Sequence, residues 1–334
     1  MDLGELLMRA ARLTWRHKTL WWLGLLPGLT HLATSLARLW VMDYARREIW
    51  PLLRGVSTEP PPSLEQWLLS PEFSQAFFNG RFLLLLVGWL FLAAVVFWLL
   101  VTLAEAAVIA ATVSITDGRS PTVAQALSTG RRWLSRFIAI DAVVFLPWFI
   151  IALGALVVMG VTVGVTAVRA TQETTVSAML TSLGLGLSCT ALLACLLIPV
   201  GFLATRFRTL AFRDAALSDS QEVAGGVLHG NVQQNINHTW QIIRQNLAEV
   251  IILVGMVWGL QYIFNLLLSL ISLPLGLATA VPTLLSFSQP GSGNTAVANL
   301  VGLGTAVLLA VPQALLFVYF GVLWTLAYLE WNEA

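Results

Sequence analysis

Residues 82–115 read FLLLLVGWLFLAAVVFWLLVTLAEAAVIAATVSI, and this stretch decides the class of the protein. Its one charged residue is Glu105. A helix rises about 1.5 Å per residue, and about 20 apolar residues cross the hydrocarbon core of a bilayer. The stretch therefore predicts a transmembrane helix longer than the core requires, and we expect it to tilt or to emerge on one side.

The composition of the whole chain agrees with a lipid environment. Of its 334 residues, 57% are hydrophobic and 10% are charged, and the mean hydropathy is +0.81. Soluble domains carry about 25% charged residues, so the composition excludes a water-soluble globule. The formal net charge is +1. A balance so close to neutral excludes a strongly basic surface, and we expect no nucleic acid among the partners.

Further apolar runs bring the prediction to about six transmembrane helices. The fold class expected is all-α, a polytopic integral membrane helical bundle in which residues 1–334 form a single membrane domain. Residues 273–285 are apolar but contain Pro274 and Pro282, and we expect a re-entrant or interfacial segment there. The six predicted spans cover about residues 19–39, 82–115, 137–168, 179–210, 248–277 and 297–329.

Basic residues set the predicted orientation, because cytoplasmic loops of membrane proteins carry an excess of them. With the N-terminus inside, the cytoplasmic side holds the basic residues within 9–18, 119–136 and 206–213, together with Arg244. The outer side then holds half as many. We expect a multi-pass protein of the bacterial cytoplasmic (inner) membrane with both termini in the cytoplasm.

An internal repeat is the most specific pattern in the chain. A short segment with helical spacing of apolar and polar residues precedes the first, third and fifth spans, which predicts three interfacial amphipathic helices in a pseudo-threefold repeat. The repeat units cover about residues 1–115, 119–213 and 222–334. The three apolar stripes are Leu3, Leu6, Leu7, Ala10 and Leu13; Val123, Ala126, Leu127, Gly130, Trp133 and Leu134; and Val232, Ile236, Trp240, Ile243 and Leu247.

Two smaller patterns concern the start of a predicted helix and the membrane interfaces. Ser120 and Pro121 predict a helix cap with proline in the first turn, and Thr122 and Gln125 have the spacing of a capping box. Tryptophans near the predicted membrane interfaces, such as Trp15, are typical of an aromatic belt. Others in the same position are Trp21, Trp22 and Trp133.

Three acids lie inside apolar spans, and intramembrane ionisable residues are expensive enough to suggest a function. Asp141 and Glu249 each follow a basic residue at a membrane entrance by five positions. One interpretation is proton or cation coupling. The other is structural pairing of interfacial acids with arginines of the inner loops. The candidate polar or ion-pair cluster is Glu105, Asp141, Glu249, Arg136, Arg206, Arg208 and Arg244.

A polar stripe runs along the fifth predicted span. Gln261, Asn265, Ser269 and Ser272 recur at helical spacing, and Gln313 beside Pro312 in the sixth span could face them. The stripe predicts either hydrogen bonds between helices or a path for a polar substrate. We expect it to face the bundle or a water-filled cavity.

Patterns of catalysis are missing from the sequence. It has no G-x-S-x-G, no H-E-x-x-H and no P-loop, and its four histidines are scattered. His17 and His238 are expected to be interfacial side chains rather than catalytic bases. We therefore expect no enzyme activity, no cofactor and no metal site.

Three stretches carry a resemblance to a known family: residues 12–24 (RLTWRHKTLWWLG), 206–213 (RFRTLAFR) and 240–247 (WQIIRQNL). The chain resembles an uncharacterised family of six-span bacterial membrane proteins related to the membrane domain of some glycerophosphodiester phosphodiesterases. In those enzymes a separate soluble barrel carries the catalytic residues. We expect no such domain here, so the resemblance implies a membrane domain without phosphodiesterase activity.

Two functions remain open from the sequence. The first is a structural or scaffold role in which the three surface helices bind membrane lipids or another membrane or cytoplasmic protein. The alternative is a small-molecule or lipid transporter that uses the polar stripe with the three acids. A polar cavity continuous from the cytoplasmic face to mid-membrane would favour transport, and a centre filled with Leu and Val would exclude it.

Overall fold

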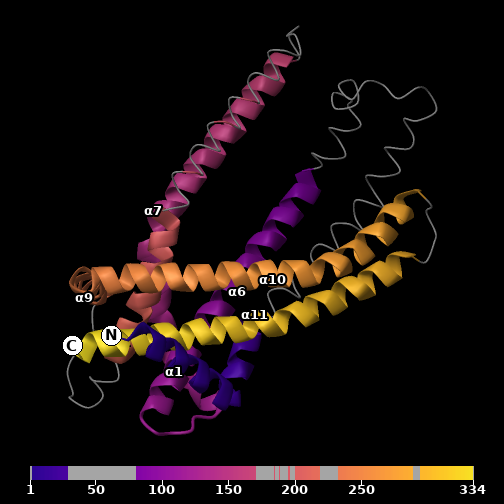
Figure 1. Cartoon of the computed structure of the whole chain (residues 1–334). Helices are drawn as coiled ribbons and strands as arrows, with labels where there is room; N and C mark the ends of the chain where they lie inside the picture. The colour runs from indigo at the N-terminus through magenta and orange to yellow at the C-terminus, as the bar shows by residue number, and fades with distance from the viewer. Residues whose placement is uncertain are drawn as a thin grey trace. The chain divides into compact units, whose positions relative to one another are not determined.

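A computed structural model describes residues 2–28, 80–170, 200–218, 232–288 and 294–333, with the single positions 184, 188 and 195. This part of the chain is α-helical and contains no strand, so the all-α prediction is confirmed for it. Residues 18–28 and 201–218 are helical in addition to the labelled helices. Those are α1 (Leu3–Arg16), α6 (Gly80–Thr116), α7 (Val123–Ala170), α9 (Val232–Gln245), α10 (Leu247–Ser288) and α11 (Asn294–Glu333) (Figure 1).

Four of these helices are long and apolar enough to cross a bilayer. The candidate spans are Phe91–Thr116, Val123–Ile151, Leu247–Pro274 and Leu300–Asn332. They overlap four of the six predicted spans and support a membrane-embedded protein. Most of the spans predicted at 19–39 and 179–210 lies outside the described residues.

Residues 273–285 belong to a continuous helix rather than to a re-entrant segment, and the interfacial alternative stays a prediction. Figure 1 shows α10 as one helix, which continues through Pro274 and Pro282 to Ser288. Each proline removes a single N–H from the helical ladder. In an apolar setting the remaining backbone groups are best satisfied inside a helix, so two prolines do not end α10.

The chain forms two compact units. The first unit comprises residues 131–254 with 324–334, and the second comprises residues 2–130 with 255–323. Their boundaries fall inside α7, α10 and α11. The three predicted repeat units divide the chain differently, and they remain a prediction.

Small residues let helices of the second unit approach closely. A Cβ atom added to Gly130 would lie 2.8 Å from the backbone nitrogen of Ala107, so α6 and α7 meet at their backbones. A Cβ on Gly24 would overlap the carbonyl oxygen of Ala314, which brings residues 18–28 equally close to α11. Such contacts between small residues are typical of helices packed in membranes, where close van der Waals contact drives association.

Aromatic side chains fill the first unit. The rings of Phe137 on α7 and Phe212 on the helix of residues 201–218 stack at 4.0 Å between centroids. Trp133 stacks on Phe137 at 6.5 Å and is only 7% exposed. The prediction that Trp133 belongs to an interfacial belt is therefore wrong. Trp133 belongs to the predicted apolar stripe of its segment, and that stripe packs here against protein.

Candidate functional site

Polar and charged side chains gather in the first unit around the helix of residues 201–218. This helix passes the predicted end of the fourth span at Leu210, and its last two turns are buried. It carries Arg206, Arg208, Arg213 and Asp214. Arg208 and Asp214 contact side chains on other elements, and Arg213 contacts the backbone of its own helix. The candidate site consists of three polar contacts that it and its neighbours form.

The first contact joins Asp141 on α7 to Arg208. The arginine donates from both Nε and one terminal nitrogen, the second over 3.3 Å to Oδ2 of Asp141. Asp141 is 2% exposed, and the guanidinium also lies 4.2 Å from the ring centroid of Phe212. A two-pronged, charge-assisted contact of this kind fixes orientation as well as adding attraction. The sequence predicted that Asp141 pairs with an inner-loop arginine, and Arg208 is among those it named.

The second contact is centred on Asp214. Its Oδ1 atom accepts the hydroxyl hydrogen of Tyr328 on α11 and lies 2.5 Å from Nδ1 of His238 on α9. Asp214 is 4% exposed and Tyr328 is fully buried, whereas His238 is 51% exposed. With the carboxylate ionised, His238 must carry its proton on Nδ1 to donate to it. One carboxylate thus joins three elements of the unit.

The third contact joins the first turn of α10 to the end of α11. The indole nitrogen of Trp331 donates to Oε2 of Glu249 over 2.7 Å. Glu249 is half-buried and stands where the dipole of α10 favours a negative charge. The sequence predicted an arginine partner for Glu249, and the structure adds an indole that the sequence did not suggest.

The other members of the predicted cluster lie at different levels of burial. Glu105 is buried on α6 in the second unit. Arg206 lies over the ring of Phe202 at 5.0 Å, and its Nε atom makes no hydrogen bond within the described part of the chain. Arg136 is half-buried and Arg244 is exposed.

The predicted polar stripe lies on α10 in the second unit. Asn265 and Ser269 are exposed, while Gln261 and Ser272 are half-buried. The Ser272 hydroxyl donates over 3.0 Å to the carbonyl oxygen of Ser269, inside its own helix. Gln313 is half-buried on α11, and no hydrogen bond joins it to the stripe among the residues described. Two members of the stripe on α10 are thus exposed and two are half-buried, and the expectation that it faces the bundle or a water-filled cavity stays a prediction.

Sequence reasoning missed Asp214, Tyr328 and Trp331 and assigned His238 to the interface. A signal for Asp214 was present, because it follows Arg213 within the apolar run TLAFRDAAL of residues 209–217. An acid among alanines on a helix is expensive unless it is paired. Where the structure describes the chain, no group of three or more His, Cys, Asp or Glu side chains is placed to hold a metal ion.

The three contacts share one chemical character. Each satisfies a carboxylate with donors from a different element, and Tyr328, Trp331 and Asp141 are buried. Such an arrangement holds helices in register, and His238 beside Asp214 is the most exposed of the described side chains that form it. Comparisons with protein-family models, with curated proteins and with solved structures found nothing that matches this chain.

Proposed function

We propose that this protein is a non-catalytic scaffold of the bacterial cytoplasmic membrane that binds membrane lipids through surface helices. In this proposal it has six spans, three interfacial helices in a pseudo-threefold repeat and both termini in the cytoplasm. A second candidate partner is another membrane or cytoplasmic protein. The resemblance to the membrane domain of some phosphodiesterases agrees with this role.

Exposed tryptophans on helices too polar to span a bilayer carry the proposal. Trp15 on α1 is 71% exposed, and Trp240 on α9 is 54% exposed. The opposite side of each helix is buried, through Leu6 and Ala10 on α1 and through Asn235 and Thr239 on α9. A helix that packs on protein with one side and presents a tryptophan on the other fits the headgroup region of a bilayer.

Basic residues on α1 support the same role. Arg12 and Arg16 are exposed beside Trp15, and Met8 is exposed one turn below Arg12. An apolar surface flanked by arginines is attracted both to acyl chains and to anionic headgroups. Trp240 on α9 and Leu247 at the start of α10 are similarly exposed, and Arg244 lies between them in sequence.

The polar contacts of the first unit support a scaffold over catalysis or coupling. Asp141, Asp214 and Glu249 each have a donor from another element, so their carboxylates serve the packing of the unit. A proton-coupled transporter would instead need one of these acids to open to water during its cycle.

Transport by the polar stripe is the alternative, and one observation favours it. Asn265 and Ser269 are exposed on a helix whose other exposed residues are mainly leucine and isoleucine. Polar groups in that position need a partner, which a water-filled path would supply.

Spin-label accessibility in the full-length protein tests both functions. In lipid nanodiscs, with Cys189 and Cys195 replaced, labels at positions 15 and 240 should lie about 5–10 Å into the headgroup and acyl boundary. Gln241→Cys is the matched control, because Gln241 is exposed beside Trp240 on the polar side of α9. Equal access of a water-soluble relaxation agent to positions 240 and 241 would contradict the scaffold proposal. Water access to a label at position 265 would favour transport.

A further inference from the structure

The turn between α6 and α7 is built by two helix caps, one at the end of α6 and one at the start of α7. Gly118 has a φ of +78°, which an L side chain rarely adopts. Its N–H donates to the carbonyl of Ile115 over 3.0 Å, and the N–H of Arg119 donates to that of Ser114 over 2.9 Å. This pair of bonds is the Schellman motif, and it ends α6 with Arg119 held just beyond the last turn.

The start of α7 is fixed by a reciprocal capping box. The N–H of Gln125 donates to the hydroxyl oxygen of Thr122 over 3.3 Å, and Oε1 of Gln125 accepts from the N–H of Thr122 over 3.0 Å. The sequence predicted this box. It also placed Pro121 in the first turn, but α7 begins at Val123, so Pro121 precedes the cap.

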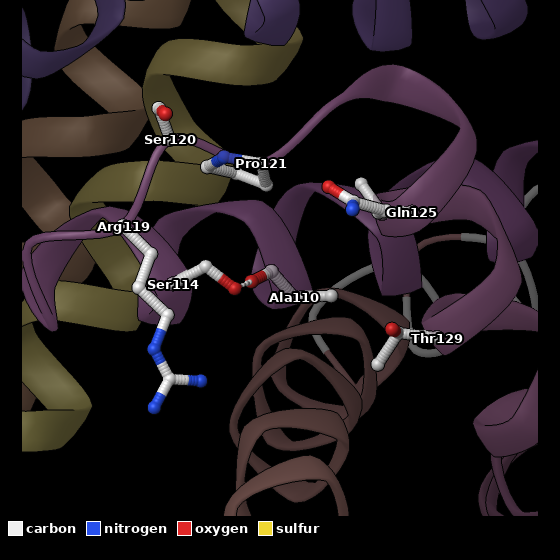
Figure 2. A pocket seen from close by; sticks show the side chains of 8 residues that line it. Ala110, Ser114, Arg119, Ser120, Pro121, Gln125 and Thr129 are labelled. Carbon is white, nitrogen blue, oxygen red and sulfur yellow. Dashed lines mark hydrogen bonds between the residues drawn. The ribbon is translucent and has the colours of Figure 1, made fainter.

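A pocket of about 360 Å³ lies between these two helix ends, within the second unit. Gly130, which follows the lining residue Thr129, approaches Ala107 closely and so holds α6 and α7 together. Figure 2 shows Arg119 and Ser114 on one side of this pocket and Gln125 and Thr129 on the other. Its lining residues are Ala110, Ser114, Arg119, Ser120, Pro121, Gln125, Ala126 and Thr129.

The chemistry of this lining favours an anion. Among the described residues that line it, Arg119 is the one charged residue and none is a carboxylate. The guanidinium of Arg119 makes no hydrogen bond or ion pair among the described residues. Ser120 and Thr129 offer hydroxyl donors, and Gln125 offers its amide nitrogen because its oxygen is used in the cap. The N-terminus of α7 adds partial positive charge at the same place.

The pocket also lies at the level expected for headgroups. The candidate span Phe91–Thr116 ends three residues before Arg119, and the next candidate span begins at Val123. A turn that follows the end of a spanning helix stands at the bilayer surface whichever side it faces, whether an interfacial segment or a further span comes next. Pockets that hold small molecules have volumes of about 300–1,000 Å³, so there is room for a phosphate with a small substituent.

We propose that this pocket binds a phosphate group, in which Arg119 is the residue that pairs with the anion and the other polar side chains of the lining complete the site. The phosphate comes either from a lipid headgroup or from a small soluble phosphate compound. The inference deepens the proposed function, on which it rests, because it assigns a specific anion site to a protein proposed to bind lipid.

The test uses the full-length protein in detergent with two probes. Inorganic phosphate is titrated while its binding is measured with radiolabelled phosphate, and phosphatidylglycerol retention is measured by native mass spectrometry. Arg119→Gln should weaken whichever binding is present about tenfold or more, because a charge-assisted contact is lost. Arg119→Lys should keep most of it, since the charge remains. Arg131→Gln is the matched control, an exposed arginine on α7 that does not line the pocket.

Each outcome bears on the proposal. Arg119-dependent binding of phosphatidylglycerol alone supports a lipid source, and Arg119-dependent binding of inorganic phosphate supports a soluble one. If neither inorganic phosphate nor phosphatidylglycerol binds, or if Arg119→Gln and Arg131→Gln lose binding equally, the proposal is overturned. Because Arg119 is exposed, we expect the melting temperature of ligand-free protein to stay unchanged in these variants. The spin-label depths at positions 15 and 240 are read independently, so failure of the pocket and failure of the scaffold role are distinguishable.

Discussion

Tyr328 donates its hydroxyl hydrogen to Asp214 across 114 positions of sequence, and both side chains are buried. The bond ties the end of α11 to the helix of residues 201–218. A buried carboxylate that loses a donor retains the full cost of its desolvation, which is larger than the net gain from an average hydrogen bond. The stability of the first unit should therefore depend on this contact more than on its partly exposed neighbours.

We expect Tyr328→Phe to destabilise the protein by about 1–3 kcal/mol, because it removes one donor and leaves the carboxylate of Asp214 buried. The measurement is unfolding of the full-length protein in detergent. Tyr319→Phe is the control, since Tyr319 is half-buried on the same helix and makes no hydrogen bond among the described residues. Equal effects of the two substitutions would show that the Asp214 contact adds nothing.

Asp141→Asn tests whether the contact with Arg208 is structural. Removing one partner of a buried ion pair costs about 3–5 kcal/mol, because the other charge stays buried. We expect a loss of that size, and a smaller loss when Arg208→Gln accompanies it. Asp117→Asn, at an exposed position beyond α6, should change stability by less than about 0.5 kcal/mol. Unchanged or improved stability in Asp141→Asn would point to coupling of a flux instead.

Close helix contact in the second unit can be tested at its glycines. A Cβ on Gly130 would meet the backbone of α6, which cannot yield as a flexible side chain can. Overpacking of this kind costs about 1–3 kcal/mol, so Gly130→Ala should lower the melting temperature. At Gly255 on α10 nothing lies within 4 Å of the added Cβ. Gly255→Ala should be neutral or stabilising by up to about 1 kcal/mol, because alanine favours the helix. Similar melting temperatures for the two variants would contradict the backbone contact of α6 and α7.

Local features of this chain could be predicted because they depend on neighbours in sequence. The capping box of Thr122 and Gln125 and the extent of α6 follow from spacing and hydropathy within a few turns. The contact of Asp141 with an arginine could be predicted as well, since a buried acid requires a cation or hydrogen-bond donors.

Contacts between distant segments could not be predicted in the same way. Periodicity indicates which residues share a face of one helix, but not which helix covers that face. The buried residues of α9 are Asn235, Thr239 and Ile242, although the predicted apolar stripe runs through Trp240. Composition alone cannot distinguish a stripe that faces protein from one that faces lipid. Tyr328 and Trp331 were missed for this reason.

The orientation of the chain is the last prediction. Single cysteines in a cysteine-free background should react with an impermeant reagent from outside intact cells at positions 46 and 292, which lie outside the described residues. Positions 128 and 332 should react only after the cells are opened, because both are exposed on the side predicted to be cytoplasmic. Asn235, in the segment before the fifth span, is too buried to report, so Gln233 on the exposed side of α9 takes its place. Labelling of intact cells at position 128 would reverse the topology and place the Arg119 pocket at the outer surface. The anion proposed there would then have to come from the outer leaflet or from the periplasm.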